Sequence, residues 1–224
     1  MKTKTIMTIV FLIIAMHSLA QETNTITDSR DGQTYKTVRI GTQTWMAENL
    51  KTTKYRNGDQ IATTSSPGLN IKKEASASKY QWAYKGDEKN VTTYGRLYTW
   101  YAVTDSRAIC PAGWHIPAET DWQTLTDFLA SDNIAGGKMK ETGTAHWNEP
   151  NKGATNESGF LALPGGYRNF DVSFDGIGMA SYWWSATENF NTNGWSRVIN
   201  WISSNLSKNT ENKAYGFSVR CIKD

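Results

Sequence analysis

The chain has 224 residues, with 24 lysines and arginines against 21 acidic residues, so its formal net charge is +3. This small excess of positive charge gives no electrostatic reason to expect binding to nucleic acids or to an anionic membrane. The sequence holds three histidines, which excludes a metal site built mainly from imidazoles. Ten tryptophans and ten tyrosines are many for this length, and their rings can build a core or line a ligand surface.

The first 20 residues have the pattern of a secretory signal peptide. Lys2 and Lys4 precede an apolar run at 6–16, and Ser18 and Ala20 supply the small residues that a signal peptidase reads. The run is shorter than the about 20 residues that span a bilayer. We therefore expect cleavage before Gln21 and export to the periplasm, the cell surface or the extracellular space, with no membrane-spanning segment in the mature chain.

The chain contains two cysteines, Cys110 and Cys221. In an exported protein, a pair of cysteines is most simply explained by one disulfide, because the compartment is oxidising. The predicted bond ties the middle of the chain to its last predicted strand and closes a loop of about 110 residues.

We expect one domain over residues 31–224, preceded by a flexible lead at 21–30, because no linker rich in proline, glycine or serine divides the chain. Alternating apolar residues predict a strand at 35–40, and Gly41 predicts a turn into a return strand at 43–47. Residues 63–79 are polar and are expected to form a surface loop. Apolar residues at positions 97, 100, 101 and 103 favour a short helix within 94–103.

The clearest predicted helix follows Pro117, and its apolar face is expected to carry Trp122, Leu125, Phe128 and Leu129. Thr120 and Gln123 fit a capping box at its start, and Asp132-Asn133 together with Gly136-Gly137 are expected to end this helix. Strands are then predicted at 182–185, 195–199 and 215–221. The expected class is α+β, with two helices in the first two-thirds of the chain and a second half rich in strands and loops.

Seven phrases carry a resemblance to one family: WMAENL at 45–50, YGRLY at 94–98, CPAGWHIP at 110–117, NESGF at 156–160, LPGGYR at 163–168, YWWSAT at 182–187 and GFSVRC at 216–221. In this order, they are similar to phrases of the Fibrobacter succinogenes major paralogous domain family over about residues 31–223. The resemblance implies an exported bacterial surface or envelope domain with no established biochemical activity.

The phrase at 114–117, followed by Trp122, also resembles formylglycine-generating-enzyme-like domains, whose fold is a variant of the C-type-lectin-like fold. This resemblance implies two helices, a small twisted antiparallel sheet and long loops. Formylglycine-generating enzymes use a cysteine pair to bind copper and activate oxygen. Because Cys110 and Cys221 are expected to be used in a structural disulfide, we expect no enzymatic activity.

The tripeptide Glu149-Pro150-Asn151 is similar to the loop that supplies calcium ligands in C-type lectins. Carboxylate and amide oxygens are the ligands that this ion prefers. The second lectin element, Trp-Asn-Asp, is missing from the chain, and the loop also fits the paralogous family without calcium. We therefore expect no cofactor, and Glu149 and Asn151 are the candidates if calcium binds.

Aromatic residues crowd the second half of the chain, where they can form a core or stack on sugar rings. On a strand, Trp183 and Trp184 must point to opposite faces. Arg168 and Arg220 can each bind an acidic ligand or hold a loop through hydrogen bonds. The residues named as ligand-binding candidates are Trp147, Asn151, Tyr167, Arg168, Tyr182, Trp183 and Trp195.

The expected function is non-catalytic binding of a glycan or a protein ligand at the cell surface or in the envelope, without nucleic acid as a partner. A structural or protein-adhesion module is the first alternative. An enzyme derived from a formylglycine-generating scaffold is the second.

Overall fold

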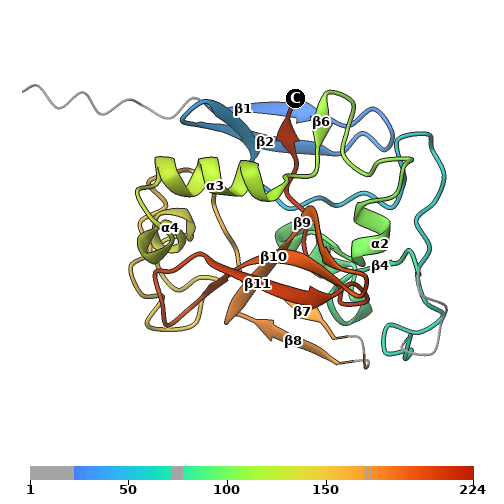
Figure 1. The fold of residues 1–224 in the computed structure, drawn as a ribbon. Helices are drawn as coiled ribbons and strands as arrows, with labels where there is room; N and C mark the ends of the chain where they lie inside the picture. The colour runs from blue at the N-terminus through green and yellow to red at the C-terminus, as the bar shows by residue number, and fades with distance from the viewer. Residues whose placement is uncertain (1–22, 72–77, 170, 172) are drawn as a thin grey trace, which may run out of the picture.

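The protein is an α+β domain with few helices and several mainly antiparallel sheets (Figure 1). The computed structural model describes residues 23–71, 78–169, 171 and 173–224, so the predicted signal peptide at 1–20 and part of the predicted surface loop at 63–79 lie outside the described residues. None of the helices in these ranges combines the length and the apolar content needed to cross a bilayer. The elements in chain order are β1 (Thr23–Thr27), β2 (Thr34–Ile40), β3 (Gln43–Met46), β4 (Gln81–Trp82), the 3-10 helix η1 (Tyr84–Gly86), α1 (Lys89–Tyr94), β5 (Leu97–Tyr98), α2 (Trp100–Val103), β6 (Trp114–His115), α3 (Glu119–Phe128), α4 (Asp132–Met139), β7 (Gly165–Arg168), β8 (Phe174–Ile177), β9 (Ala180–Phe190), β10 (Asn193–Asn200), β11 (Ser207–Asn212) and β12 (Ile222–Lys223).

The first sheet joins the start of the described chain to its end, in the order β1-β2-β3-β12-β6. The predicted hairpin at 35–40 and 43–47 corresponds to β2 and β3, in which Val38 pairs with Trp45 and both side chains are buried. β1 lies within residues 21–30, where we expected a flexible lead. Each residue of β1 has a partner on β2, because threonine and isoleucine suit a strand and Ile26 packs against the core.

The second sheet has the order β11-β10-β9-β7-β8, and the predicted strands at 182–185 and 195–199 lie inside β9 and β10. Trp183 and Trp184 belong to two different apolar clusters, as expected for neighbours on a strand. Both side chains are fully buried. Packed cores therefore cover both faces of β9 at this point.

The predicted helix after Pro117 is α3, which lies between the two five-stranded sheets (Figure 1). Trp122, Leu125 and Leu129 are buried, as expected. Phe128 is 61% exposed, so its assignment to the buried face was wrong. At about 100° of rotation per residue, Phe128 lies roughly a quarter-turn away from the stripe formed by the other three residues.

The predicted capping box of Thr120 and Gln123 is not formed. α3 begins two residues earlier than that box requires, and the carboxylate of Asp121 accepts a hydrogen bond of 2.8 Å from the backbone N–H of Ala118. The carboxylate therefore satisfies one of the free N–H groups at the start of the helix.

Residues 132–133 and 136–137, which we expected to end the helix after Pro117, instead lie in a further helix, α4, and the glycine pair is in its interior. A Cβ atom at Gly136 would lie 2.2 Å from the carbonyl oxygen of Asn205, and one at Gly137 would lie 2.4 Å from that of Gly153. The glycines thus allow α4 to approach two loops closely, and this tertiary contact outweighs their low helix propensity.

Two segments are less regular than predicted. Residues 94–103 contain the end of α1, the two-residue strand β5 and the single turn α2, whose start is capped by the Thr99 hydroxyl. Residues 215–221 form isolated bridges, including Phe217 with Tyr98 and Gly216 with Arg168, before regular pairing begins in β12. Both segments make long-range pairings, which their local sequence patterns do not encode.

The interior has two apolar clusters on opposite sides of β9. The helix-side core contains Trp45, Trp122, Phe160 and Trp183, and the residues of α3 and α4 contribute to it. The loop-side core contains Tyr98, Trp184, Phe217 and both cysteines. Strand β9 therefore separates a core covered by helices from a core covered by loops.

Candidate functional site

The predicted disulfide is present between Cys110 and Cys221, with a sulfur–sulfur distance of 2.03 Å and a sequence separation of 111 residues. Both residues are buried, and each lies just before one of two paired strands, β6 and β12, in which His115 pairs with Ile222. The bond uses both thiols of the chain. It therefore fixes the last strand to the segment that leads into α3.

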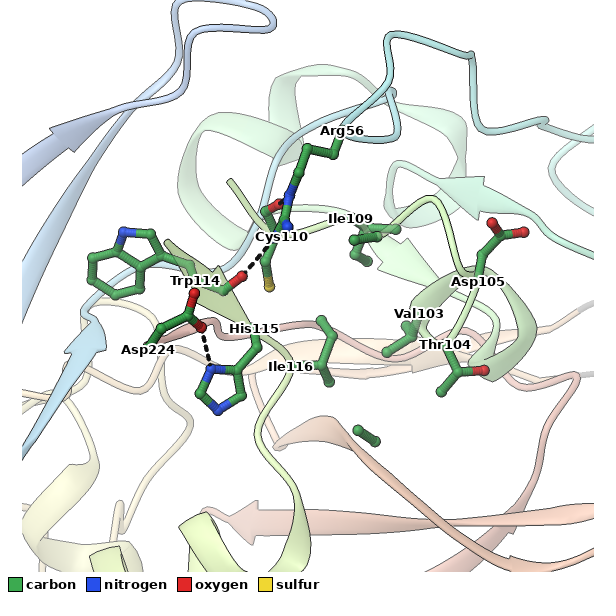
Figure 2. Close-up of a pocket in the computed structure, with 12 residues that line it drawn as sticks. Arg56, Val103, Thr104, Asp105, Ile109, Cys110, Trp114, His115, Ile116 and Asp224 are labelled. Carbon is green, nitrogen blue, oxygen red and sulfur yellow. Dashed lines mark hydrogen bonds and ion pairs between the residues drawn. The ribbon is translucent and has the colours of Figure 1, made fainter. Parts of the chain in front are cut away.

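A pocket of about 470 Å³ opens beside this disulfide. Figure 2 shows apolar side chains, among them Val103, Ile109 and Ile116, with His115 and Asp224 together at one end. The volume lies within the about 300–1,000 Å³ range of small-ligand sites.

The polar groups around the pocket have partners within the protein. His115 Nδ1 lies 2.7 Å from Asp224 Oδ1, and its Nε2 lies 3.6 Å from a carboxylate oxygen of Asp121. The guanidinium of Arg56 donates to the carbonyl oxygens of residues 110, 111 and 114. The hydroxyl of Thr104 donates to the Trp100 carbonyl, so this lining hydroxyl is not directed at the imidazole.

Asp105 also lines this pocket, and its side chain is only 2% exposed. Hydrogen bonds from Arg107, together with an ion pair with Lys79 at 2.6 Å, hold the pKa of the Asp105 carboxyl well below its usual range. The carboxylate is thus a fixed, paired charge, which suits a structural role.

Two of the ligand-binding candidates, Trp147 and Trp183, are buried in the helix-side core. The indole of Trp147 donates to the carbonyl of Ala162, and the indole of Trp183 donates to Asn49 Oδ1 at 2.9 Å. In each tryptophan, the ring packs in the core and the indole N–H forms a hydrogen bond within the protein. The structure therefore assigns these tryptophans to the core and not to a ligand surface.

Arg168, another candidate, is fully buried over the Trp82 ring. Its guanidinium donates to the carbonyl oxygens of Pro67, Leu69 and Asn169. Of the two roles considered for Arg168, the structure shows the one that holds a loop through hydrogen bonds. This placement corrects its candidacy as a ligand-binding residue.

Glu149 and Asn151, the calcium candidates, do not converge with other acidic groups. Glu149 is exposed, whereas Asn151 is buried and donates through Nδ2 to the carbonyls of Glu141 and Gly143. In the ranges that the structure describes, no group of three or more acidic, histidine or cysteine side chains is placed to hold a metal ion. The Asn151 side-chain amide therefore holds two parts of the loop together through these hydrogen bonds.

Trp195 on β10 is half-buried, and the Lys208 ammonium lies 4.0 Å from the centre of its ring. Its neighbour two positions on, Arg197, pairs in register with Trp183 and forms an ion pair with Glu119 of α3. Because side chains two residues apart share a strand face, Trp195 lies on the helix side of the sheet.

Two remaining candidates, Tyr167 on β7 and Tyr182 on β9, meet on the other side of the sheet. Their ring centres are 4.8 Å apart, and Tyr215 lies 6.2 Å from Tyr167. All three rings are half-buried and rest against the buried ring of Phe217, which stacks on Tyr182 at 4.9 Å. We call Tyr167, Tyr182 and Tyr215 the tyrosine face.

Two carboxylates border the tyrosine face. Asp175 on β8 is exposed and is the register partner of Tyr167, and Glu211 on β11 is half-buried. Burial raises the pKa of the Glu211 carboxyl, and burial together with the nearby Tyr167 and Glu211 raises the pKa of Tyr182 to about 12. Tyr182 is therefore a neutral phenol at physiological pH.

Sequence reasoning missed Tyr215, Asp175 and Glu211. The alternation in β9 could have shown that Tyr182 shares a face with Trp184. The other three residues come from separate segments, and only the strand register and the path of residues 213–218 bring them to the same place.

A family model described as the Fibrobacter succinogenes major domain matches residues 38–223 of this chain. Neither the curated proteins nor the solved structures that were searched gave a match.

Proposed function

Because the chain belongs to the Fibrobacter succinogenes major domain family, whose description names no activity, we propose from the geometry that it is an exported, non-catalytic domain that binds glycans through the tyrosine face. The observation that carries the proposal is the packing of Tyr167, Tyr182 and Tyr215, from three separate segments, into one partly exposed aromatic surface.

The tyrosine face suits a flat, partly apolar ligand such as a sugar ring. Each tyrosine offers a rigid apolar ring with a polar hydroxyl, and it loses little conformational entropy on binding. The rings are also held in place, because Tyr167 contacts Tyr182, and Tyr182 stacks on the buried Phe217. A preformed surface of this kind reduces the cost of ordering that binding would otherwise carry.

The groups with catalytic potential support a non-catalytic role. The two cysteines are joined to each other. The His115–Asp224 pair lies in a pocket whose lining hydroxyl, Thr104, donates to a backbone carbonyl. The charged groups of this pocket are thus used in internal pairs.

The same proposal includes export and a C-type-lectin-like arrangement. The buried disulfide supports export, because such bonds persist in oxidising compartments. Two longer helices, a sheet that joins β12 to the N-terminal strands, and long loops support the lectin-like arrangement.

A glycan array, probed with and without calcium, tests the proposed function. We expect binding that does not need calcium and that falls at least about tenfold in Tyr182→Ala, because truncation removes a central ring of the face. Tyr101→Ala is the matched control, since Tyr101 is also half-buried but lies near Glu188 at the far end of β9. Equal binding by both variants would overturn the proposal, and an array without any binding would favour the structural or adhesion role.

A further inference from the structure

The tyrosine face is bordered by acidic groups. Tyr167 lies close enough to Asp175, Glu211 and Asp171 for all three carboxylates to act on its phenol electrostatically. Tyr215 is similarly close to Glu211 and Asp171. Aromatic rings and carboxylates therefore occupy the same part of the surface, and they come from β7, β8, β11 and the loops beside them.

The basic side chains nearest to Glu211 along the chain point elsewhere. Lys213 is buried, pairs with Glu188 and lies over the ring of Trp100. Lys208 pairs with Glu119 and lies over Trp195, on the helix side of the sheet. The backbone of Glu211 pairs with Gly194 in the sheet, whereas its side-chain carboxylate forms neither a hydrogen bond nor an ion pair with the residues that the structure describes.

From this juxtaposition we propose that the tyrosine face selects glycans that carry a positively charged amine, such as glucosamine polymers, over neutral and acidic glycans. The inference rests on the proposed function and names its ligand class. A cation is attracted to the electron-rich face of an aromatic ring, and a nearby carboxylate strengthens the attraction. The same charges repel uronic acids and sulfated sugars.

The broad shape of the face favours a sugar over an isolated lysine side chain. Ring atoms of Tyr167 lie 3.3 Å from the position that a Cβ of Gly176 would occupy, so this ring packs over β8 at the glycine. The rings of Tyr167 and Tyr182 then continue the surface onto β9. A sugar ring can stack on this area while its amine reaches a carboxylate at the border.

The test measures the affinity of the mature chain for three matched hexasaccharides: glucosamine, N-acetylglucosamine and galacturonic acid. At about pH 6, where most of the sugar amines are charged, we expect glucosamine hexamer to bind about tenfold more tightly than its acetylated counterpart. Galacturonic acid hexamer is expected to bind most weakly, and added salt should reduce the preference for the amine.

Glu211→Gln and Asp175→Asn keep the shape of the side chains and remove their charges, so each should reduce the preference for the amine while acetylated hexamer still binds. Glu157→Gln is the matched control, because Glu157 lies in a different loop and pairs with Lys138 of α4. Equal affinity for the amine and its acetylated form would overturn this inference and leave the proposed function standing. If no glycan binds, both fail; if polylysine displaces the glucosamine hexamer at equal amine concentration, the partner is a basic peptide and the glycan assignment is wrong.

Discussion

The two faces of strand β9 are completed in different ways. On the helix side, Trp183 is enclosed by Trp122 and Phe160, with ring centres 6.3 and 5.6 Å away, and α3 covers the cluster. On the loop side, the core that contains Trp184 continues through Phe217 to half-buried tyrosines at the surface.

This difference assigns two roles to one strand, because its helix side contributes to stability and its loop side is available for binding a ligand. Neighbouring residues of a strand point in opposite directions, so Trp183 lies on the helix side of β9 and Tyr182 lies on the loop side. We call the helix side, which is fully covered, the closed face, and the loop side, which ends in half-buried tyrosines, the open face. A fully buried ring contributes its entire apolar area to folding, whereas a half-buried ring retains area for a ligand. The following changes are expected to test this separation.

The largest expected effect comes from reducing the disulfide, because the bond lies in the loop-side core and ties β12 into the first sheet. In the chain-entropy model, a loop of this length contributes about 4–5 kcal/mol to the free energy of unfolding. We expect a marked fall in melting temperature after reduction and alkylation. A melt that stays unchanged, with two alkylated thiols found by mass spectrometry, contradicts this expectation.

Truncating Trp183 on the closed face should lower the free energy of unfolding almost as much. Trp183→Ala removes a fully buried indole and its hydrogen bond to Asn49, and we expect a loss of about 3–5 kcal/mol in urea unfolding. Trp183→Phe retains much of the ring volume and should lose clearly less. Equal losses in the two variants would show that the packing of the indole is not what stabilises this face.

A third prediction concerns the buried ammonium of Lys140, which donates to the carbonyls of Lys152, Asn200 and Ser203 at 2.9 to 3.1 Å. Burial lowers the pKa of Lys140 from 10.5 to about 8. Between these values the unfolded chain binds more protons than the folded one, so stability should rise with pH by up to about 1.4 kcal/mol per unit.

Lys140→Met is the matched variant, because it keeps the length of the side chain and cannot titrate. Near pH 8 it should be less stable by about 2–3 kcal/mol, since three buried carbonyls lose their donor. As pH rises towards 10, urea unfolding should show the difference from the wild type growing. A difference that stays constant or shrinks means that the folded chain holds the Lys140 proton as tightly as the unfolded chain does.

The smallest effect on stability is expected for Tyr182→Ala, on the open face. Its ring is half-buried, so the loss should be about 1 kcal/mol or less, well below that of the adjacent Trp183→Ala. Thermal unfolding of both variants under the same conditions makes the comparison. Losses of similar size would show that the two faces contribute equally to folding and would remove the distinction drawn above.

Patterns within a short segment were enough to predict much of this fold. Alternation identified β2, β3 and the centre of β9, and the spacing of Trp122, Leu125 and Leu129 identified α3. The disulfide followed from the presence of two cysteines in a chain expected to be exported. Each of these features depends on residues that lie close together or on a pairing without alternatives.

The incorrect predictions concern features that depend on contacts between segments distant in the sequence. Gly136 and Gly137 remain helical because two loops approach them, a contact that the local sequence does not contain. Two of the five aromatic candidates, Trp147 and Trp183, are core residues, since a sequence shows that a ring is present and does not show what covers it. Of the predicted ligand residues, Tyr167 and Tyr182 come together at a partly exposed surface, and their acidic neighbours could be found only through strand register.

Buried cations that donate to backbone carbonyls have a consequence for how freely the loops can vary. Lys140 and Arg168 hold loop positions through oxygen atoms that every amino acid provides, so the hold does not depend on which side chains the loop carries. Such loops can exchange side chains and keep their path. The path of these loops is therefore independent of the side chains that they present to the solvent. The binding specificity of the loops can change while the fold stays the same.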